Sequence, residues 1–157
     1  VLFGRTPHLP YFGFPTEKDK AIATEMMQQI GIWHLKDKAF SQMSGGEQQL
    51  TIIARALTQQ PTYIVMDEPT SALDFGNQLK VLQQVKALQS QDIGIILSTH
   101  NPDHVFLCDS EVAVVKDHTI AALGTPNELM TETLLKDLYE VEIKIINQKN
   151  RKICFPL

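Results

Sequence analysis

The sequence predicts an α/β protein with parallel strands at its centre. Two short apolar segments, "TYIVMD" at 62–67 and "GIILST" at 94–99, have the composition of strands that are buried on both faces. The segment 75–90 between them has the spacing of an amphipathic helix, with its inner side formed by Leu79, Leu82 and Val85. A strand, a helix and a second strand in this order are typical of a parallel sheet, and an antiparallel pair is expected nearer the end.

The composition excludes several classes of protein. The 157 residues are 43% hydrophobic and 20% charged, which suits one globular domain with a core of its own. The formal net charge of −4 offers no basic surface for nucleic acid or an anionic membrane. No apolar run approaches the roughly 20 residues of a membrane-spanning helix. Cys108 and Cys154 lack metal-ligand spacing, and reduced thiols are favoured over a disulfide.

The first part of the chain is expected to be irregular and then helical. The stretch "VLFGRTPHLPYFGF" at 1–14 is apolar, aromatic and rich in proline, which indicates irregular structure or the end of a helix. A helix is expected over 17–30, because Thr16 and Asp19 have the spacing of a capping box and Gly31 can end the helix.

The clearest amphipathic helix is expected over 47–58. Its apolar residues recur at i, i+3, i+4 and i+7 and so form one buried face, made of Leu50, Ile53, Ala54 and Leu57. Pro61 closes this segment. It is preceded by Ser44 and two glycines, and this junction is typical of a helix N-terminus that can bind an anion.

The last third of the chain predicts one helix, two strands and a final helix. Asn101 as N-cap and Pro102 at the first position start a helix at "NPDHVFLC". The runs "EVAVV" at 111–115 and "TIAAL" at 119–123 predict two strands joined by a tight turn at 116–118. The segment "TPNELMTETLLKDLY" at 125–139 predicts the final helix, with a capping box formed by Thr125 and Glu128 and with Pro126 at the first position.

Two acidic residues follow the first predicted strand directly. Asp67 and Glu68 are neighbours, and the alternation of strand side chains sends their carboxylates in different directions. One of them can bind a divalent metal, and the other can orient or deprotonate an attacking water. An acidic pair that only caps the next turn is the alternative, but the longer motif "YIVMDEPTSALD" argues for chemistry.

Two more positions can contact a phosphate. At "SGGE", Ser44 supplies a hydroxyl, while Gly45 and Gly46 allow a ligand to approach the backbone closely, although a plain glycine-rich N-cap has the same pattern. His100 follows the second predicted strand and can donate a hydrogen bond to a phosphate or hold a water. The other histidines are expected on the surface or in helices: His8, His34, His104 and His118. Trp33 is expected to pack in the core rather than to stack on a base.

In this order, "MSGGE" at 43–47, "YIVMDEPTSALD" at 63–74 and "STH" at 98–100 closely resemble the C-terminal half of an ATP-binding-cassette (ABC) ATPase. The resemblance covers about residues 1–125. It implies a P-loop NTPase-like parallel sheet with a helical signature subdomain. It also implies three parts: a helical and signature subdomain, the rest of the RecA-like ATPase core, and a C-terminal helix and tail, at 1–60, 61–125 and 126–157.

The resemblance also assigns roles to the residues that match the motifs. Ser44, Gly45, Gly46 and Glu47 belong to the signature motif and bind the nucleotide of a partner subunit. Asp67 is the Walker B aspartate for Mg²⁺, Glu68 is the catalytic carboxylate, and His100 is the switch histidine. Asp74 ends the loop "SALD" that communicates across the dimer and contributes to ATP binding.

This sequence departs from the family pattern at the signature motif and upstream of it. Met43 stands where leucine is usual, and Glu47 stands where glutamine is usual, which leaves the contacts of Glu47 open. The chain has no phosphate loop and begins at Val1. We therefore expect it to belong to a longer polypeptide, to be inactive alone, and to leave one sheet edge and one core face uncovered. The family works as a head-to-tail dimer in which each ATP lies between a phosphate loop and the partner's signature motif.

Two segments are similar to one group of importers. "VLFGRTPHLPYFG" at 1–13 and "LGTPNELMTETLLKDLYEVEIKI" at 123–145 resemble the ATPases that import iron–siderophore complexes, haem and cobalamin, and relatives of this type carry oxyanions such as molybdate. The resemblance implies transmembrane permease subunits as partners, indirectly a substrate-binding protein, and a peripheral location on the cytoplasmic face of the cell membrane. Residues 2–14 would lie near the site that receives the permease's coupling helix.

Two other classes of function stay open at this point. A soluble ATPase of DNA repair or chromosome structure uses a similar signature, but this chain has no heptad run or basic patch. A non-hydrolysing module would fit the missing phosphate loop. The presence of both Glu68 and His100 argues against a decayed ATPase.

Overall fold

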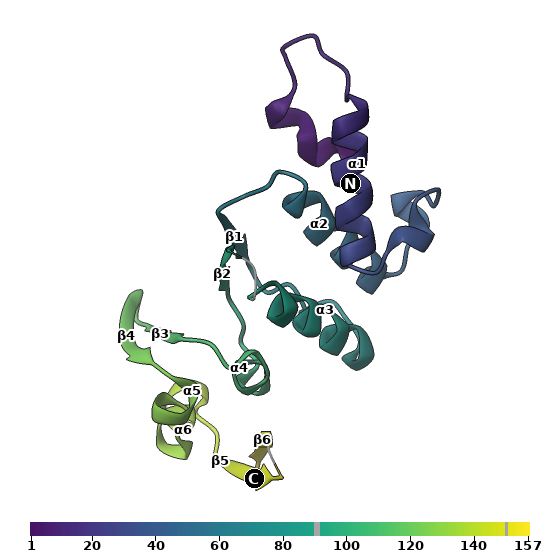
Figure 1. Cartoon of the computed structure of the whole chain (residues 1–157). Helices are drawn as coiled ribbons and strands as arrows, with labels where there is room; N and C mark the ends of the chain where they lie inside the picture. Colours follow the sequence, from purple (N-terminus) through teal and green to yellow (C-terminus); the bar gives the residue numbers. More distant parts are fainter. Residues whose placement is uncertain (90–91, 150) are drawn as a thin grey trace. The chain divides into compact units, whose positions relative to one another are not determined.

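The computed structural model describes residues 1–89, 92–149 and 151–157, which form two compact units, Val1–Ser98 and Thr99–Leu157. Figure 1 shows the order of helices and strands along the chain. The α/β class is confirmed, because each unit combines helices with paired strands. The finer division at residues 60 and 125 stays a prediction.

The first unit contains mainly helices and one pair of strands. Its elements in chain order are η1 (Leu2–His8), α1 (Glu17–Gln29), η2 (Trp33–Leu35), η3 (Phe40–Gln42), α2 (Gly45–Leu57), β1 (Tyr63–Met66), α3 (Phe75–Leu88) and β2 (Gly94–Leu97). The helix predicted over 75–90 is confirmed as far as Leu88, and its last predicted residue, Ser90, lies outside the described residues.

Local capping sets the limits of α1. The Thr16 hydroxyl accepts a hydrogen bond from the Asp19 N–H, and the Asp19 carboxylate accepts from the Thr16 N–H, which completes the predicted capping box. After the helix, Gly31 has φ of +78°, a conformation that glycine adopts without strain. Both predicted ends of this helix are therefore confirmed.

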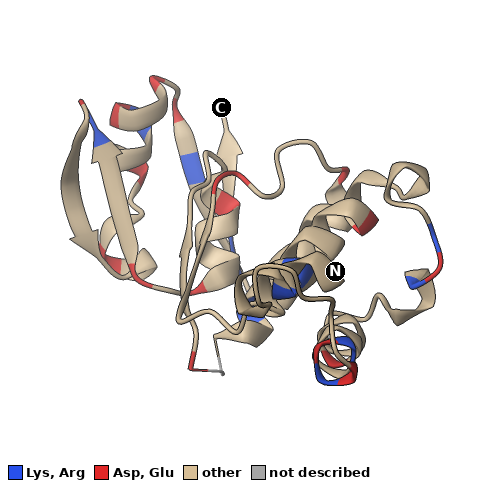
Figure 2. Ribbon diagram, turned by 90° about the horizontal axis from the view of Figure 1, so that it is seen from above, with Lys and Arg blue, Asp and Glu red and all other residues tan. Residues whose placement is uncertain are grey.

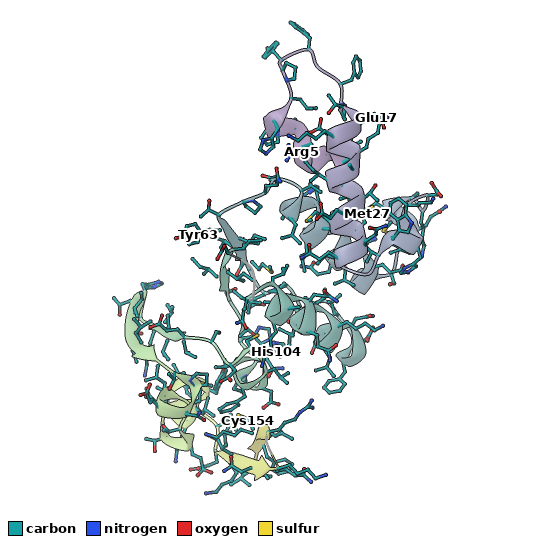
Figure 3. The ribbon with its side chains drawn as sticks, viewed as in Figure 1. Arg5, Glu17, Met27, Tyr63, His104 and Cys154 are labelled. Carbon is teal, nitrogen blue, oxygen red and sulfur yellow. The ribbon has the colours of Figure 1, made fainter. Side chains whose placement is uncertain are left out.

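A buried ion pair connects η1 to α1 and α2 within the first unit (Figure 3). The Arg5 Nε donates to Asp19 Oδ1 at 2.9 Å, and Arg5 Nη1 donates to the Thr58 carbonyl oxygen at 2.8 Å and to Gln60 Oε1 at 3.0 Å. The side chains of Arg5 and Asp19 are 6% and 10% exposed. This network anchors both stems of the segment 9–15 against the C-terminal end of α2.

The core of the first unit lies between its strands and helices. The predicted apolar face of α2 packs with one face of β1, with α3 and with the η2 region. The buried residues of this core are Ile30, Ile32, Leu35, Ile53, Ala54, Leu57, Ile64, Met66, Val81, Val85 and Leu88. Leu50, also predicted on this face, is partly buried against the same cluster. Burial of these apolar side chains is the main stabilising term for the unit.

β1 and β2 pair in parallel, as predicted, with Tyr63 opposite Gly94 and Met66 opposite Leu97. The prediction that β1 is buried on both faces is wrong within this chain. Ile64 and Met66 are buried, whereas Tyr63 and Val65 are 69% and 73% exposed, because the described helices cover one face of the pair. The expectation of an uncovered sheet edge and core face stays a prediction.

The second unit contains two hairpins and three short helices. Its elements are α4 (Pro102–Cys108), β3 (Val112–Lys116), β4 (Thr119–Gly124), α5 (Pro126–Leu129), α6 (Glu132–Tyr139), β5 (Ile143–Gln148) and β6 (Arg151–Pro156). The predicted turn between β3 and β4 is confirmed. Its residues Asp117 and His118 have φ of 50° and 61°, which suits the right-handed twist of a two-residue hairpin loop.

The single C-terminal helix predicted over 125–139 is wrong, because the segment forms two helices. Met130 has ψ of 78°, which breaks the helix, and the Thr131 hydroxyl then accepts from the Leu134 N–H as the N-cap of α6. The capping box of Thr125 and Glu128 is present, but it starts only the four-residue α5. The tail beyond α6 forms the antiparallel β5–β6 hairpin, which the sequence pattern did not predict.

Acidic and basic residues both occur along the chain. Figure 2 shows acidic and basic positions interspersed along both units, in keeping with the net charge of −4. Within 1–89, 92–149 and 151–157, no helix has the length and apolarity needed to span a bilayer. Cys108 is buried and Cys154 is half-buried, and in the described part of the chain neither forms a disulfide.

Candidate functional site

The ends of the two parallel strands bring Asp67, Glu68 and Ser98 together. Ser98 Oγ donates to Asp67 Oδ1 at 2.5 Å, and the Glu68 N–H donates to Ser98 Oγ at 2.9 Å. The Ser98 N–H donates to the Met66 carbonyl oxygen at 2.9 Å, which continues the sheet register by one residue. The parallel pairing thus delivers both carboxylates and a hydroxyl to the same edge, as expected for strands whose carboxyl ends carry a site.

The backbone turns sharply at Glu68. This residue has φ of 42°, a left-handed conformation that is uncommon for a residue other than glycine and concentrates at functional sites. The Ser71 N–H and hydroxyl both donate to the Glu68 carbonyl oxygen, at 3.2 Å and 3.1 Å, and fix the turn that follows. Asp67 is exposed and Glu68 is half-buried, so both carboxylates are accessible to a ligand.

The oxygen ligands at this edge suit a Mg²⁺ ion that takes most of its other ligands from water and phosphate. A carboxylate held in place by a neighbouring hydroxyl is a suitable hard ligand, and Asp67 is such a group. Among the described residues, no three histidine, cysteine or acidic side chains cluster closely enough to hold a metal ion. Mg²⁺ commonly takes one or two carboxylates and completes its shell with water and substrate phosphate oxygens.

A cavity of about 220 Å³ adjoins Asp67 within the first unit. Its lining comes from one side of α2 and from the end of β1, and consists of Gln49, Ile52, Ile53, Ala56, Ile64, Val65, Met66, Asp67 and Pro69. It is mostly apolar, so the carboxylate of Asp67 stands at the polar end of an apolar cleft.

Ser44 and Glu47 form a complete capping box at the start of α2. The Ser44 hydroxyl accepts from the Glu47 N–H, and the Ser44 N–H donates to Glu47 Oε2 at 2.7 Å. Lys38 Nζ donates to the same oxygen at 2.8 Å, and the two hydrogen bonds lower the pKa of Glu47 to about 2. Glu47 is therefore a helix-capping anion paired with Lys38, and glutamine could fill the same capping role.

The two glycines of this motif have different surroundings. A Cβ added at Gly46 would lie 2.5 Å from Asn77 Cγ, so this glycine is needed for the close approach of α2 to the start of α3. A Cβ at Gly45 would lie 3.4 Å from Leu73 Cδ2, which is an ordinary contact. The contact with Asn77 gives a packing reason for Gly46, and the predicted close approach of a ligand to either glycine stays a prediction.

Asp74 caps α3 and reaches the signature segment through Asn77. Its carboxylate accepts from the Asn77 N–H at 3.0 Å and from Asn77 Nδ2 at 2.6 Å, and these bonds lower the pKa of Asp74. Because Asn77 also lies against Gly46, the loop that ends at Asp74 and the N-terminus of α2 are packed together. Two parts of the predicted site are joined in this way.

His100 belongs to the second unit, where its flanking residues are fixed. Thr99 Oγ1 lies 3.0 Å from His104 Nδ1 and accepts from the Asn101 N–H at 3.1 Å. Tyr139 Oη donates to the His100 carbonyl oxygen at 2.8 Å. His104 was expected in a helix or on the surface; it lies in α4 but is buried, 5% exposed, and this burial lowers its pKa (Figure 3).

Sequence reasoning missed four residues that support this site: Lys38, Asn77, Ser98 and Tyr139. Ser98 left a visible signal, since it is polar and follows an apolar strand. The others act over contacts that no local pattern encodes; Tyr139, for example, is 39 residues from His100.

The chain is similar to known proteins in sequence and in fold. The ABC transporter family model matches residues 4–71. An ABC transporter ATP-binding protein of Haemophilus influenzae, itself uncharacterised, is 37% identical over 148 residues, which are 94% of this chain and 56% of that protein. The molybdate import ATP-binding protein of the same organism is 35% identical over 135 residues, which cover 85% of this chain and 53% of the relative.

A solved structure has the same fold over nearly the whole chain. It is an inward-facing conformation of a metal-chelate-type ABC transporter. The TM-score is 0.89 and the sequence identity is 30%, and the match covers 99% of this chain and 64% of that chain. This similarity confirms the predicted P-loop NTPase-like α/β fold. The chain spans about half the length of the curated relatives it matches.

Proposed function

We propose that this chain, whose residues 4–71 belong to the ABC transporter family, is part of a subunit that hydrolyses ATP to power import across a membrane. The observation that carries the proposal is the hydrogen-bonded arrangement of Asp67, Glu68 and Ser98 at the ends of two parallel strands. A hydrolase of this kind needs one carboxylate near the metal and another near the attacking water. Both are present here, directly after the end of β1.

Each carboxylate has a separate role in this proposal. Asp67, with one oxygen held by Ser98, would bind Mg²⁺, which neutralises charge on the phosphates when bound. Glu68, whose backbone is left-handed with φ of 42°, would orient the attacking water and accept its proton. His100 would donate to the phosphate that is transferred to water.

The N-terminus of α2 would bind the phosphate of an ATP held by a second copy of the subunit. This 13-residue helix begins at Gly45, and its first N–H groups favour an anion. The negative charge of Glu47 is compensated by Lys38 at 2.8 Å, which reduces its repulsion of a phosphate. A head-to-tail dimer would place this half-site opposite the partner's nucleotide.

The permease would dock on the segment 9–15. Tyr11, Phe12 and Phe14 in this segment are 95%, 91% and 88% exposed, and aromatic side chains clustered on a surface are typical of an interaction site. The buried Arg5–Asp19 pair at its base provides a firm support. The subunit would then lie peripherally on the cytoplasmic face of the membrane, next to its permease.

The cargo class proposed is a metal chelate, with an oxyanion such as molybdate as the alternative. The similarity to a metal-chelate-type transporter structure covers 99% of this chain, and a molybdate import protein is 35% identical. An ATPase subunit does not contact the cargo, so the proposed cargo class rests on similarity to other importers.

The experiment is to copurify the full-length protein with its permease and reconstitute both in proteoliposomes. Mg-ATP hydrolysis is then measured with a ferric siderophore, haem, cobalamin or molybdate and the matching binding protein. We expect one cargo to stimulate hydrolysis, and we expect the Glu68→Gln assembly to show no stimulation. A protein that hydrolyses ATP but copurifies with no membrane protein would contradict the import role and favour a soluble ATPase.

A further inference from the structure

The C-terminal helix α6 contacts the backbone of His100. Tyr139, the last residue of α6, donates from its hydroxyl to the His100 carbonyl oxygen at 2.8 Å. The side chain is partly buried, and this burial raises the pKa of Tyr139 above its ordinary value of 10.0. The phenol therefore stays protonated, and so remains a hydrogen-bond donor, throughout the neutral range.

Other contacts hold the residues on both sides of His100. Thr99 Oγ1 is bonded to the ring of buried His104 and accepts from the Asn101 N–H. Further along α4, Asp103 Oδ1 accepts from the Cys154 N–H of β6 at 2.7 Å. The segment before His100 is thus fixed by α4, and α4 itself is fixed by the C-terminal hairpin.

We propose that Tyr139 is a positioning residue for His100, so that the C-terminal segment sets the direction of the switch histidine. This inference rests on the proposed ATPase function. The peptide between residues 100 and 101 is held at its N–H, which donates to Thr99 Oγ1, and its carbonyl oxygen is the second group that can be anchored. The hydroxyl of Tyr139 fixes its carbonyl, which in turn defines the backbone from which the imidazole projects. A group that must be held within about 0.5 Å of its working geometry needs such support.

Tyr139→Phe removes only the hydroxyl and tests this role in the full-length dimer. One neutral hydrogen bond corresponds to about a threefold to tenfold change in rate. We expect kcat for ATP hydrolysis to fall by that factor, while KM for ATP stays unchanged, because His100 misorientation affects turnover and not the binding of ATP. The matched control is Thr119→Ala, which removes an exposed hydroxyl from the β3–β4 hairpin of the same unit and should leave both constants unchanged.

A double-mutant cycle separates positioning from a general loss of structure. His100→Ala and His100→Ala/Tyr139→Phe are compared in single-turnover assays with excess enzyme. We expect equal rates for these two variants, since the hydroxyl acts through His100. The inference is overturned if Tyr139→Phe has the kcat of the parent, or if the Phe substitution slows the His100→Ala protein by the same factor.

The outcomes also separate this inference from the proposed function. If Glu68→Gln and His100→Ala both slow hydrolysis but Tyr139→Phe does not, only the role of Tyr139 fails. If the parent protein hydrolyses no ATP, the proposed function fails first. If His100→Ala has normal activity, the assignment of His100 and the positioning role of Tyr139 fail together.

Discussion

Ser98 donates its hydroxyl hydrogen to Asp67 Oδ1 across 2.5 Å, and this contact joins the ends of two strands that are 31 residues apart in sequence. The same hydroxyl oxygen accepts the Glu68 N–H. One serine thus holds the position of one carboxylate and the backbone of the other. Through these two hydrogen bonds, Ser98 joins Asp67 and Glu68 into a single site.

We predict that Ser98→Ala lowers ATP turnover by about tenfold to 150-fold, the value of one hydrogen bond to a charged group. The concentration of Mg²⁺ at half-maximal rate should rise, because Asp67 loses the donor that orients it. The measurement is a Mg²⁺ titration of ATP hydrolysis. Thr119→Ala, which removes a hydroxyl from the β3–β4 hairpin, is the control and should leave the titration unchanged. An unchanged titration for Ser98→Ala would show that the contact has no functional role.

The two glycines of the signature segment should respond differently to alanine. Gly46→Ala places a Cβ 2.5 Å from Asn77 Cγ and should destabilise the fold by about 1–3 kcal/mol, as measured by chemical denaturation. Gly45→Ala places a Cβ 3.4 Å from Leu73 Cδ2, an ordinary contact, so it should keep the stability of the parent. We expect it to impair ATP-dependent dimerisation, because a glycine at the start of α2 lets a phosphate approach the backbone closely. The assignment is contradicted if Gly45→Ala dimerises normally with ATP.

Two carboxylates make the stability of the first unit depend on acid pH. Hydrogen bonds from Thr16 and then Arg5 lower the pKa of Asp19 from 3.8 to about 2, and bonds from Lys38 and the Ser44 N–H lower that of Glu47 from 4.5 to about 2. Each contribution is fully present above the unfolded pKa and is lost as the pH falls from about 4.5 to 2.

We therefore predict that the free energy of unfolding falls between pH 4.5 and pH 2, and that Asp19→Asn and Glu47→Gln each reduce this dependence. Denaturant unfolding at several pH values provides the measurement. Glu17→Gln is the control, since Glu17 is 89% exposed in its surface pair with Lys20. Equal pH dependence in the parent and the three variants would mean that the carboxylates of Asp19 and Glu47 contribute no more to the pH dependence of stability than an exposed carboxylate does.

The exposed aromatic segment provides a test of partner binding. Replacing Tyr11 and Phe12 by serine removes two side chains that are 95% and 91% exposed, so the fold should be unaffected. We predict loss of copurification with the permease and normal ATP hydrolysis by the isolated subunit. Phe75, 75% exposed at the start of α3, is the matched control for loss of surface aromatic area. Retained copurification would exclude this segment as the permease contact.

Features encoded by neighbouring residues could be predicted from the sequence. The capping boxes at Thr16 and Thr125 depend on residues three positions apart, and the strands at 63–66 and 94–97 follow from short apolar runs. The positions of Asp67 and Glu68 at a strand end followed from the same pattern. Such features depend on backbone geometry alone.

Features that depend on contacts distant in sequence could not be predicted. The bonds from Arg5 to Thr58 and from Cys154 to Asp103 span 53 and 51 residues, and no periodicity encodes them. The break at Met130 was missed because the apolar spacing continues through it, although Thr131 has the side chain of an N-cap. Burial on one face of β1 depends on which elements cover the pair, and strand composition does not determine this.

The most direct test of the central claim, that Glu68 activates the attacking water, is ATP hydrolysis by the full-length Glu68→Gln protein. The amide keeps the size of the side chain but cannot accept the proton from water. The account predicts a fall in kcat of about 100-fold or more, with ATP binding and ATP-dependent dimerisation retained. Hydrolysis at a rate close to that of the parent protein would contradict it.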